Sequence, residues 1–290
     1  IQDVLPKIFT IVLKDMKKEV VQLNQVYEFF KVNKEKYEHF VLNKVNKSIP
    51  QKCEFCPVCP WLDTCEKIWK DKDDLNQVYG MNKNYSKKLK HQKIKTASIL
   101  SKQKIDKKLE GFRVEISKKL ITQAKLQKDY EKSGKPIFKI YEENLNKIKK
   151  GFNLVPKPSA CDLFFDIESV PDYIVSGKLE YLFGFYYVEN GKEKFKPMWA
   201  HTKNEEKNNV SKFFDFTEKH FKKYPGAKIY HYASYEITAL EKLTSFHQIN
   251  MIEYDHYLTM GKFVDLFKVI KQAMQVSENS YSIKNLEKFY

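Results

Sequence analysis

The sequence predicts a mixed α/β fold in its second half and a mainly helical, basic region before it. From about residue 159, apolar runs joined by turn signals are followed by alternating helical and strand patterns. This is the order of a mixed sheet with helices on its faces. Charge is also unevenly placed: residues 1–150 hold 34 Lys and Arg against 19 Asp and Glu, whereas residues 151–290 hold 18 of each. The two halves therefore differ in both pattern and charge.

The positive charge is concentrated between residues 81 and 150, which hold 21 basic and 7 acidic side chains and carry +14 of the net +15. So basic a segment favours a polyanion as its partner, and nucleic acid is the first candidate. The alternative is a solvated helical surface. No apolar run is long enough to span a membrane and no signal peptide opens the chain, so we expect a cytoplasmic protein that does not bind membranes.

The first fifty residues carry no catalytic constellation of their own. Ile8–Leu13 predicts a strand, and the spacing of apolar residues from Val20 to Val45 predicts one or two helices. These elements look like the end of a domain whose beginning is absent. Because the first residue is Ile, we expect the chain to be a piece of a longer protein.

Four of the five cysteines lie within thirteen residues, and the prolines between them force tight turns that let neighbouring thiols point at one centre. In a chain with no secretion signal, a metal centre is favoured over disulfides and over free thiols. Zinc and an iron–sulfur cluster both take four thiolates, but zinc sites usually pair two Cys-x2-Cys units across a longer gap, so the crowding favours iron–sulfur. The four residues are Cys53, Cys56, Cys59 and Cys65.

Residues 71–158 predict a basic helical connector. Apolar residues between Leu75 and Leu100 predict two short helices around a turn, and Leu120–Leu126 marks a longer helix that ends at Ser133–Pro136. Residues 147–158 form the predicted linker to the next domain. Lysines that follow a phosphate backbone would give salt-sensitive binding without sequence preference. The candidates are Lys87, Lys88, Lys90, Lys93 and Lys95.

The sheet is predicted from residue 159 onward. The pair Asn190-Gly191 predicts a tight hairpin between its second and third strands. Helices are expected over Glu205–Tyr224 and Tyr235–Leu243, whereas Cys161 and the histidines at 201, 220 and 247 are expected to be packing or surface residues. The five predicted strands cover residues 162–168, 181–188, 195–200, 228–232 and 263–266.

The first of these strands ends in two carboxylates, Asp166 and Glu168. Because side chains of a strand alternate between faces, both acids lie on one face, together with Phe164. Two acids on one face favour a nearby cation, and Mg²⁺ or Mn²⁺ suits oxygen ligands. The alternative is a strand that has reached its polar end. Glu236 follows the fourth strand at the start of a helix, so we expect all three acids to converge at one end of the sheet.

Several motifs together resemble the YprB-type branch of the DEDD exonucleases, which have a ribonuclease H-like fold. The resemblance implies metal binding by Asp166 and Glu168, and it places Glu236 where the family has its second acid, usually an Asp. Asp265 matches a downstream Asp that more often positions a helix than binds metal, and the fourth acid is expected beyond Tyr290. The motifs are Phe165–Glu168, Tyr181–Gly184, Ile229–Glu236, Val264–Leu266 and Tyr281–Glu287.

Three aromatic residues next to Glu236 are further candidates. His231, Tyr232 and Tyr235 could orient water or stack on a base, and the alternative is that they are packed strand and helix residues.

The cysteine segment resembles the C-terminal end of a RecB-like nuclease domain. The residues that carry this resemblance are Cys56–Cys65, Trp69 and Asp73–Leu75. In that family the fourth ligand comes from far upstream, which would make Cys53 a bystander; otherwise Cys53 is the local fourth ligand. The resemblance implies three regions: residues 1–70 as the end of a RecB-like domain, 71–158 as the connector and 159–290 as a truncated exonuclease domain. Proteins of this architecture sometimes continue into a superfamily 1 helicase.

The function predicted from these features is a metal-dependent nuclease. The resemblance implies a DEDD-type 3′–5′ exonuclease that acts on DNA or RNA, in which two metal ions clamp the phosphodiester and activate water. The alternative is a catalytically inactive scaffold that binds nucleic acid through the basic connector. A third interpretation, a redox protein built on the cysteines, is disfavoured because the sequence shows no cofactor-binding fold.

Overall fold

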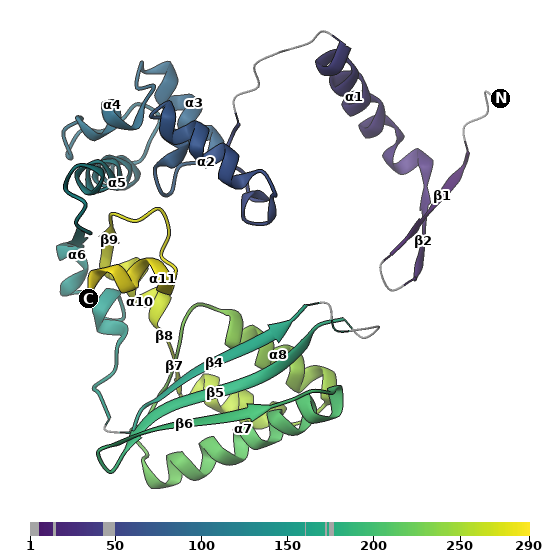
Figure 1. Ribbon diagram of the computed structural model, residues 1–290, viewed down its shortest axis with the longest axis vertical. Helices are drawn as coiled ribbons and strands as arrows, with labels where there is room; N and C mark the ends of the chain where they lie inside the picture. The colour runs from purple at the N-terminus through teal and green to yellow at the C-terminus, as the bar shows by residue number, and fades with distance from the viewer. Residues whose placement is uncertain (1–5, 14–15, 43–49, 160, 172, 174–176) are drawn as a thin grey trace. The chain divides into compact units, whose positions relative to one another are not determined.

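A computed structural model describes residues 6–13, 16–42, 50–159, 161–171, 173 and 177–290 (Figure 1). The described residues form two compact units. One lies within residues 1–50 and 172–177, and the other within 51–171 and 178–290. Among the described residues, no helix is long and apolar enough to cross a membrane.

The N-terminal unit is a hairpin followed directly by a helix. Strands β1 (Ile8–Val12) and β2 (Lys18–Gln22) pair antiparallel, and α1 spans Leu23–Leu42. The helix expected from Val20 was therefore placed too early. Val20 lies in β2 opposite Thr10, because β-branched residues favour the strand when a partner strand is within reach. The expected C-terminal extension of this helix, to Val45, lies outside the described residues.

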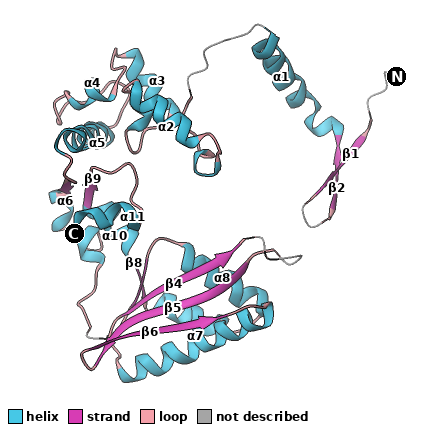
Figure 2. Ribbon diagram, in the orientation of Figure 1, coloured by secondary structure: helices cyan, strands magenta, loops and turns pink. Residues whose placement is uncertain are grey.

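The region after the cysteines is helical, as Figure 2 shows, and it has its own core. Helix α2 spans Leu62–Asp71, α3 spans Lys83–His91, α4 spans Ala97–Ser101 and α5 spans Val114–Ser133. Asn82 caps α3 by accepting the Tyr85 N–H, and Thr96 caps α4 by accepting the Ile99 N–H. The two short helices and the longer helix of the predicted connector are therefore confirmed. Fully buried residues of this core include Leu75, Leu89, Leu100, Leu109 and Ile121.

Residues 138–146 and the predicted linker after them pack against the C-terminal part of the chain, where the Gly151 N–H donates to Gln272 Oε1 (3.3 Å). Strand β3 (Phe138–Ile140) pairs with β9 (Met274–Val276), and α6 (Glu142–Leu145) precedes a 3₁₀ turn at Gly151–Leu154. Asn144 Nδ2 donates to the Gln272 carbonyl (2.9 Å), next to the end of α10 (Leu266–Ala273). The sequence did not predict this small sheet, because its strands are three residues long and far apart in the chain.

A five-stranded mixed sheet forms the second half, in the order β6-β5-β4-β7-β8. The β4–β5 and β5–β6 pairs are antiparallel, and β4–β7 and β7–β8 are parallel. The predicted hairpin is confirmed: Asn190 and Gly191 both have positive φ, as the tight turn between β5 and β6 requires. The strands are β4 (Leu163–Val170), β5 (Leu179–Glu189), β6 (Lys192–Trp199), β7 (Ile229–His231) and β8 (Phe263–Asp265).

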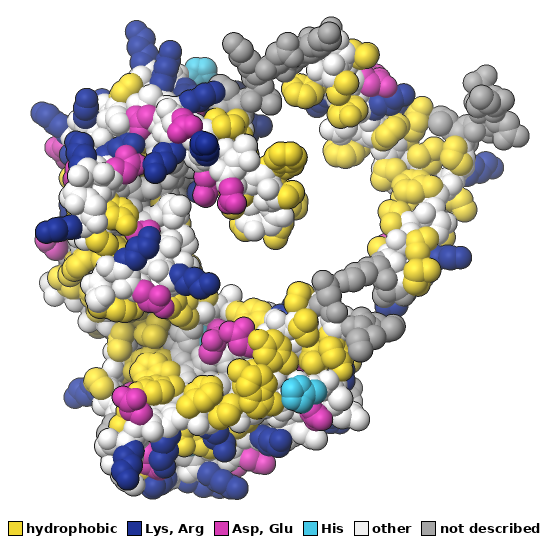
Figure 3. Space-filling view, in the orientation of Figure 1, with side chains coloured by type: hydrophobic (Ala, Val, Ile, Leu, Met, Phe, Trp, Pro, Cys, Tyr) yellow, Lys and Arg dark blue, Asp and Glu magenta, His cyan; other side chains and the backbone are white. Residues whose placement is uncertain are grey.

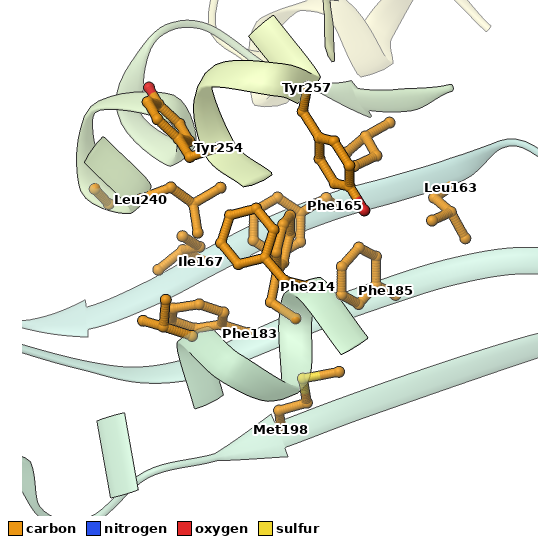
Figure 4. Packing of buried hydrophobic residues seen from close by; sticks show 14 of the residues in the cluster. Leu163, Phe165, Ile167, Phe183, Phe185, Met198, Phe214, Leu240, Tyr254 and Tyr257 are labelled. Carbon is orange, nitrogen blue, oxygen red and sulfur yellow. The ribbon is translucent and has the colours of Figure 1, made fainter. Parts of the chain in front are cut away.

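Helices cover one face of this sheet. Helices α7 (Lys203–Lys223), α8 (Tyr235–His247) and α9 (Met251–Thr259) pack against the inward-facing residues of β4 and β5. Figure 4 shows how Phe165, Phe183 and Phe185 meet Phe214 in this core. The chain then ends with α11 (Ile283–Leu286) and a 3₁₀ turn at Glu287–Phe289. The predicted fold class, a mixed five-stranded sheet with helices, is confirmed.

Candidate active site

The two acids of the first strand lie on the face of the sheet away from this core. Burial alternates along β4: Leu163, Phe165 and Ile167 are buried, whereas Asp166 and Glu168 are exposed. Glu236 lies in the first turn of α8, which follows β7, and β7 is the parallel neighbour of β4. The charges of Glu236 and Glu168 both act on Asp166. The three acids therefore lie close enough for Glu236 and Glu168 to act on Asp166, and the alternation along β4 puts Asp166 and Glu168 on one face.

This crowding contributes to a raised pKa of Asp166. Partial burial, the charges of Glu236 and Glu168, and a hydrogen bond with Glu236 raise its pKa to about 6, from a usual value of 3.8. The Ile167 N–H, 3.0 Å from Asp166 Oδ1, opposes this by stabilising the anion. At neutral pH the site thus holds carboxylates that repel one another.

Glu236 is the buried member of the group, with 4% of its surface exposed. Its Oε2 atom has no hydrogen-bond partner among the residues that the structure describes, and it lies 3.6 Å from His231 Nδ1. That nitrogen lies 2.6 Å from the Ala233 carbonyl, which can only accept, so Nδ1 carries the hydrogen and donates to it. A buried carboxylate oxygen without a partner costs free energy unless a cation reaches it.

The donor set of this site fits a divalent cation. Oxygen ligands suit Mg²⁺ and Mn²⁺, and within the described residues no Lys or Arg forms an ion pair with Asp166, Glu168 or Glu236. Anywhere in the described residues, no group of three or more His, Cys, Asp or Glu side chains is already arranged to hold a metal ion. The fit therefore rests on the partnerless Glu236 oxygen and on the repulsion recorded at Asp166.

Asp265 has a local structural task in this site. Its Oδ1 atom accepts the N–H groups of Lys268 and of Ala233, each at 3.1 Å. The first bond caps α10, and the second holds the turn before Glu236, where Ala233 has a φ of 69°, which is unfavourable for a residue with a Cβ. Asp265 thus fixes the start of α8 through Ala233, and direct metal binding by it stays a prediction.

Tyr232 and Tyr235 are both engaged by the protein. The Tyr232 hydroxyl donates to the Tyr281 carbonyl, and its ring packs edge-on against Phe267. The Tyr235 hydroxyl donates to Glu180 Oε2 (2.7 Å) and accepts from Lys178, whose amine also lies over the Tyr235 ring. These contacts hold Tyr232 and Tyr235 in place on either side of the Ala233 turn that precedes Glu236. Base stacking by Tyr232, Tyr235 or the buried His231 stays a prediction.

A buried polar network that the sequence did not predict supports this end of the sheet. Glu206 on α7 has no exposed surface; it accepts the Glu180 N–H (2.8 Å), pairs with Lys203 (2.9 Å) and lies 3.4 Å from His247 Nε2. It joins α7, α8 and the start of β5. Nothing in the local spacing distinguishes Glu206 from the surface acids of α7, because its partners come from other elements.

Two further residues behave as expected from the sequence. Cys161 is buried, and the His220 ring is buried beside it, with Nε2 donating to the Cys161 carbonyl (2.7 Å). Both are packing residues rather than parts of the acid site.

The five candidate lysines differ in their surroundings. Lys87, Lys93 and Lys95 are exposed on and just after α3. Lys88 donates to the Gly111 carbonyl (2.9 Å), and Lys90 pairs with the largely buried Asp74 (3.3 Å). The last two therefore also stabilise the helical region itself.

The four clustered thiols lie in a run of tight turns. Cys53 Sγ is 3.9 Å from Cys56 Sγ, and the Cys53 N–H donates to that same sulfur (3.2 Å). Cys65 follows in α2, where partial desolvation and then the charges of Cys59, Cys56 and Cys53 raise the pKa of its thiol. The charges of the other three cysteines thus act on Cys65, although among the described residues no three cysteines are arranged to hold a metal ion.

The fold of the second half agrees with a comparison against family models. Residues 163–290 match the RNase_H superfamily model. This ribonuclease H-like domain contains all five strands and the four candidate acids, Asp166, Glu168, Glu236 and Asp265. The match favours a nuclease, with nucleic acid as its partner. A comparison with curated proteins gave no match, and a comparison with solved structures gave none.

Proposed function

We propose that the ribonuclease H-like domain is a metal-dependent nuclease that hydrolyses phosphodiester bonds of DNA or RNA as a 3′–5′ exonuclease. The observation that carries the proposal is the gathering of Asp166, Glu168 and Glu236 on the open side of β4, where the pKa of Asp166 is raised to about 6. Carboxylates brought together without a cationic side chain are suited to bind cations, and perturbed carboxylates mark functional sites.

Each acid has a distinct part in this proposal. Asp166 and Glu168 are the exposed donors, and Glu236 is the buried donor whose position is fixed by the Ala233 turn. Two bound metal ions would stabilise the attacking and leaving oxygens of an in-line displacement. The His231 imidazole packs beside Glu236 and donates its Nδ1 proton to the Ala233 carbonyl, which fixes the orientation of the ring.

The proposal is tested with purified full chain, Mn²⁺ and a 5′-labelled single-stranded oligonucleotide. Stepwise shortening from the 3′ end would support an exonuclease, whereas internal cuts would indicate an endonuclease instead. Binding of the oligonucleotide without metal-dependent cleavage would favour the second candidate, an inactive scaffold. That candidate is supported by Glu236, which stands where the family has the shorter Asp and is almost fully buried.

We also propose that the basic helices hold the nucleic acid through its backbone. Lys87 lies in the middle of α3, Lys93 and Lys95 follow its end, and all three are exposed to solvent, where they can reach a phosphate backbone. Exposed lysines without buried partners are available for phosphate contacts, whereas Lys90 is tied to Asp74.

Replacing Lys87, Lys93 and Lys95 together by Gln is expected to weaken oligonucleotide binding and to lower the slope of log affinity against log salt by roughly 2–3, because each lost phosphate contact removes about 0.7–0.9 from it. The matched control replaces Lys207, Lys212 and Lys219, three exposed lysines of α7, and removes the same charge. Equal losses in both variants would show a general charge effect and contradict a site on α3.

The cysteine cluster is proposed to hold an iron–sulfur cluster, with zinc as the alternative. The sulfur–sulfur distance of 3.9 Å between Cys53 and Cys56, and the N–H bond to the Cys56 sulfur, support Cys53 as the local fourth ligand. Desolvation, and after it the charges of the other three cysteines, raises the pKa of Cys65, and a bound cation would stabilise the thiolates against both effects.

Anaerobically purified protein is expected to be brown, with broad visible absorbance from thiolate-to-iron charge transfer, and to lose both iron and colour in the Cys59→Ser variant. Cys161→Ala, which changes the buried cysteine of the other domain, is the control and should keep the metal. Colourless protein with one zinc per chain would indicate a zinc site, and protein with neither metal would end the proposal. The same metal analysis of Cys53→Ser tests the role of Cys53: loss of metal would indicate a fourth ligand, and full metal content would indicate a bystander.

The finer architecture is part of the proposal as well. We infer that residues 1–70 form the end of a RecB-like domain, that 71–158 connect it to a YprB-type domain at 159–290, and that a helicase domain belongs to the same full-length cytoplasmic protein. The support is the cysteine spacing and the match at residues 163–290.

A further inference from the structure

The face of the sheet that carries Asp166 and Glu168 also carries a set of exposed aromatic rings. In register across β4, β5 and β6, Phe164 lies opposite Tyr186, and Tyr186 lies opposite Phe195. All three are more than a third exposed, although rings of this size are usually buried. Figure 3 shows hydrophobic side chains gathered over these strands in the same view in which Figure 1 shows the sheet in front.

The next row on this face contains the acid. Asp166 lies opposite Gly184 of β5, and Gly184 lies opposite Pro197 of the edge strand β6. Gly184 leaves this row without a side chain at its centre. A Cβ atom built there would lie 3.3 and 3.4 Å from two atoms of the Phe195 ring and 3.9 Å from the Asp166 carbonyl oxygen. The ring of Phe195 therefore lies across β5 and close to Asp166, in the space that any other residue at 184 would fill.

Phe195 gains little from this position in the folded protein. It is 62% exposed and belongs to no buried cluster. Its neighbour Lys196 places its amine over the Phe216 ring (5.1 Å) on the helix-covered side, whereas Glu193 of the same strand hydrogen-bonds the Tyr186 hydroxyl on the aromatic face. A flat, exposed ring that lies over Gly184, in the row of Asp166, is suited to stacking, which accepts any base because every base has a π-face.

We propose that the Phe195 ring stacks on the nucleobase next to the phosphate bound at Asp166, and that Gly184 makes this placement possible. The inference rests on the proposed nuclease function. The occupant is single-stranded nucleic acid, because a paired base does not expose its face and because a phosphate held through a cation at the acids brings its base to this side of the sheet. Aromatic residues on an open sheet bind bases in this way in other single-strand-binding proteins.

The acids make this stacking dependent on metal. Without a cation, Asp166 and Glu168 repel phosphate, so the ring and the acids act together only when a divalent ion is bound. The contribution of Phe195 to affinity should therefore appear in Ca²⁺ or Mn²⁺ and vanish in EDTA. Binding by the lysines near α3 is expected to persist in EDTA, which separates the two contributions.

The test measures binding of a fluorescein-labelled oligothymidylate to the full chain with Ca²⁺ in place of Mn²⁺, and cleavage with Mn²⁺. Phe195→Ala is expected to weaken binding roughly five- to hundredfold and to raise KM more than it lowers kcat, because stacking on one base is worth about 1–3 kcal/mol. Phe195→Trp should keep the wild-type affinity. Phe246→Ala, which removes an even more exposed ring from α8, is the matched control and should bind as the wild type does.

A double-mutant cycle tests the role of Gly184. Gly184→Ala should weaken binding as Phe195→Ala does, because the new methyl group displaces the ring, and the double variant should be no weaker than Phe195→Ala alone. Gly184 does not have a positive φ, so alanine is compatible with the strand and the variant should fold. Losses that add in the double variant would overturn the proposed link between the two residues.

The outcomes separate this inference from the function on which it rests. If the wild type cleaves with Mn²⁺ and Phe195→Ala binds and cleaves unchanged, the nuclease stands and the stacking role falls, and the aromatic face then serves another partner. If the wild type shows neither metal-dependent binding nor cleavage, both fall together.

Discussion

Asp166→Asn is expected to abolish Mn²⁺-dependent cleavage and metal binding while making the metal-free protein more stable. The asparagine removes the charge on which Glu236 and Glu168 act, and a neutral amide is a much poorer ligand for a hard cation. We expect the gain in the free energy of unfolding at pH 7 to be on the order of 1 kcal/mol, because the side chain is half-exposed and solvent screens the repulsion.

The direction of this change in stability follows from the linkage between proton binding and folding. The pKa of Asp166 is raised on folding to about 6, so its ionisation disfavours the folded state. The metal-free wild type should lose stability as the pH rises from about 4 through 6, and Asp166→Asn should not show this loss. Thermal unfolding in EDTA with and without Mn²⁺ measures both effects. Asp215→Asn, at an exposed position on α7, is the control. A variant that still cleaves, or that Mn²⁺ still stabilises, would remove the acid site from the mechanism.

Metal affinity is expected to fall about tenfold for each pH unit below 6. Binding of a cation at Asp166 must displace the proton that this carboxyl holds below its raised pKa of about 6. An ordinary aspartate would keep its affinity down to about pH 4. Calorimetric titration of Mn²⁺ into the protein between pH 5 and 7.5 measures the dependence directly.

The shape of this pH profile distinguishes the crowded site from a simple surface carboxylate. Above pH 6 the affinity should level off, because Asp166 is then ionised before the metal arrives. Removing one neighbour by Glu168→Gln should move the break to lower pH, since one of the two repelling charges is gone. A profile that is flat from pH 5 to 7.5 in the wild type would contradict the raised pKa.

Much of the ribonuclease H-like domain could be predicted from local pattern. The alternation of Phe165, Asp166 and Ile167 places the acid on the open face, because side chains of a strand alternate whatever the strand pairs with. The Asn190-Gly191 pair specified its hairpin, because few other residues accept positive φ at both positions. The five strands were also predicted from local apolar patterns, and their observed ends differ from the predicted ends by a few residues.

Other features depend on partners that are far away in the chain. Val20 entered β2 instead of a helix because β1 was available for pairing. Glu206 is buried with Lys203, His247 and the start of β5, although its spacing on α7 suggests nothing unusual. Lys90 has the same local setting as Lys87 but pairs with Asp74. A local pattern cannot distinguish such residues, because their energies are set by groups on other elements.

Local sequence was enough to predict the strand of Asp166 and Glu168, the face on which they lie, the grouping of the cysteines and the basic helices, because each depends on residues close in the chain. Three features come from the assembled structure: Glu236 acts on Asp166, its Oε2 atom has no partner among the described residues, and Phe195 lies over Gly184 in the row of Asp166. These juxtapositions arise from the pairing of β4 with β7 and of β5 with β6. Strand pairing follows from the burial of one whole face of the sheet, and so it is a property of the assembled core rather than of any one segment.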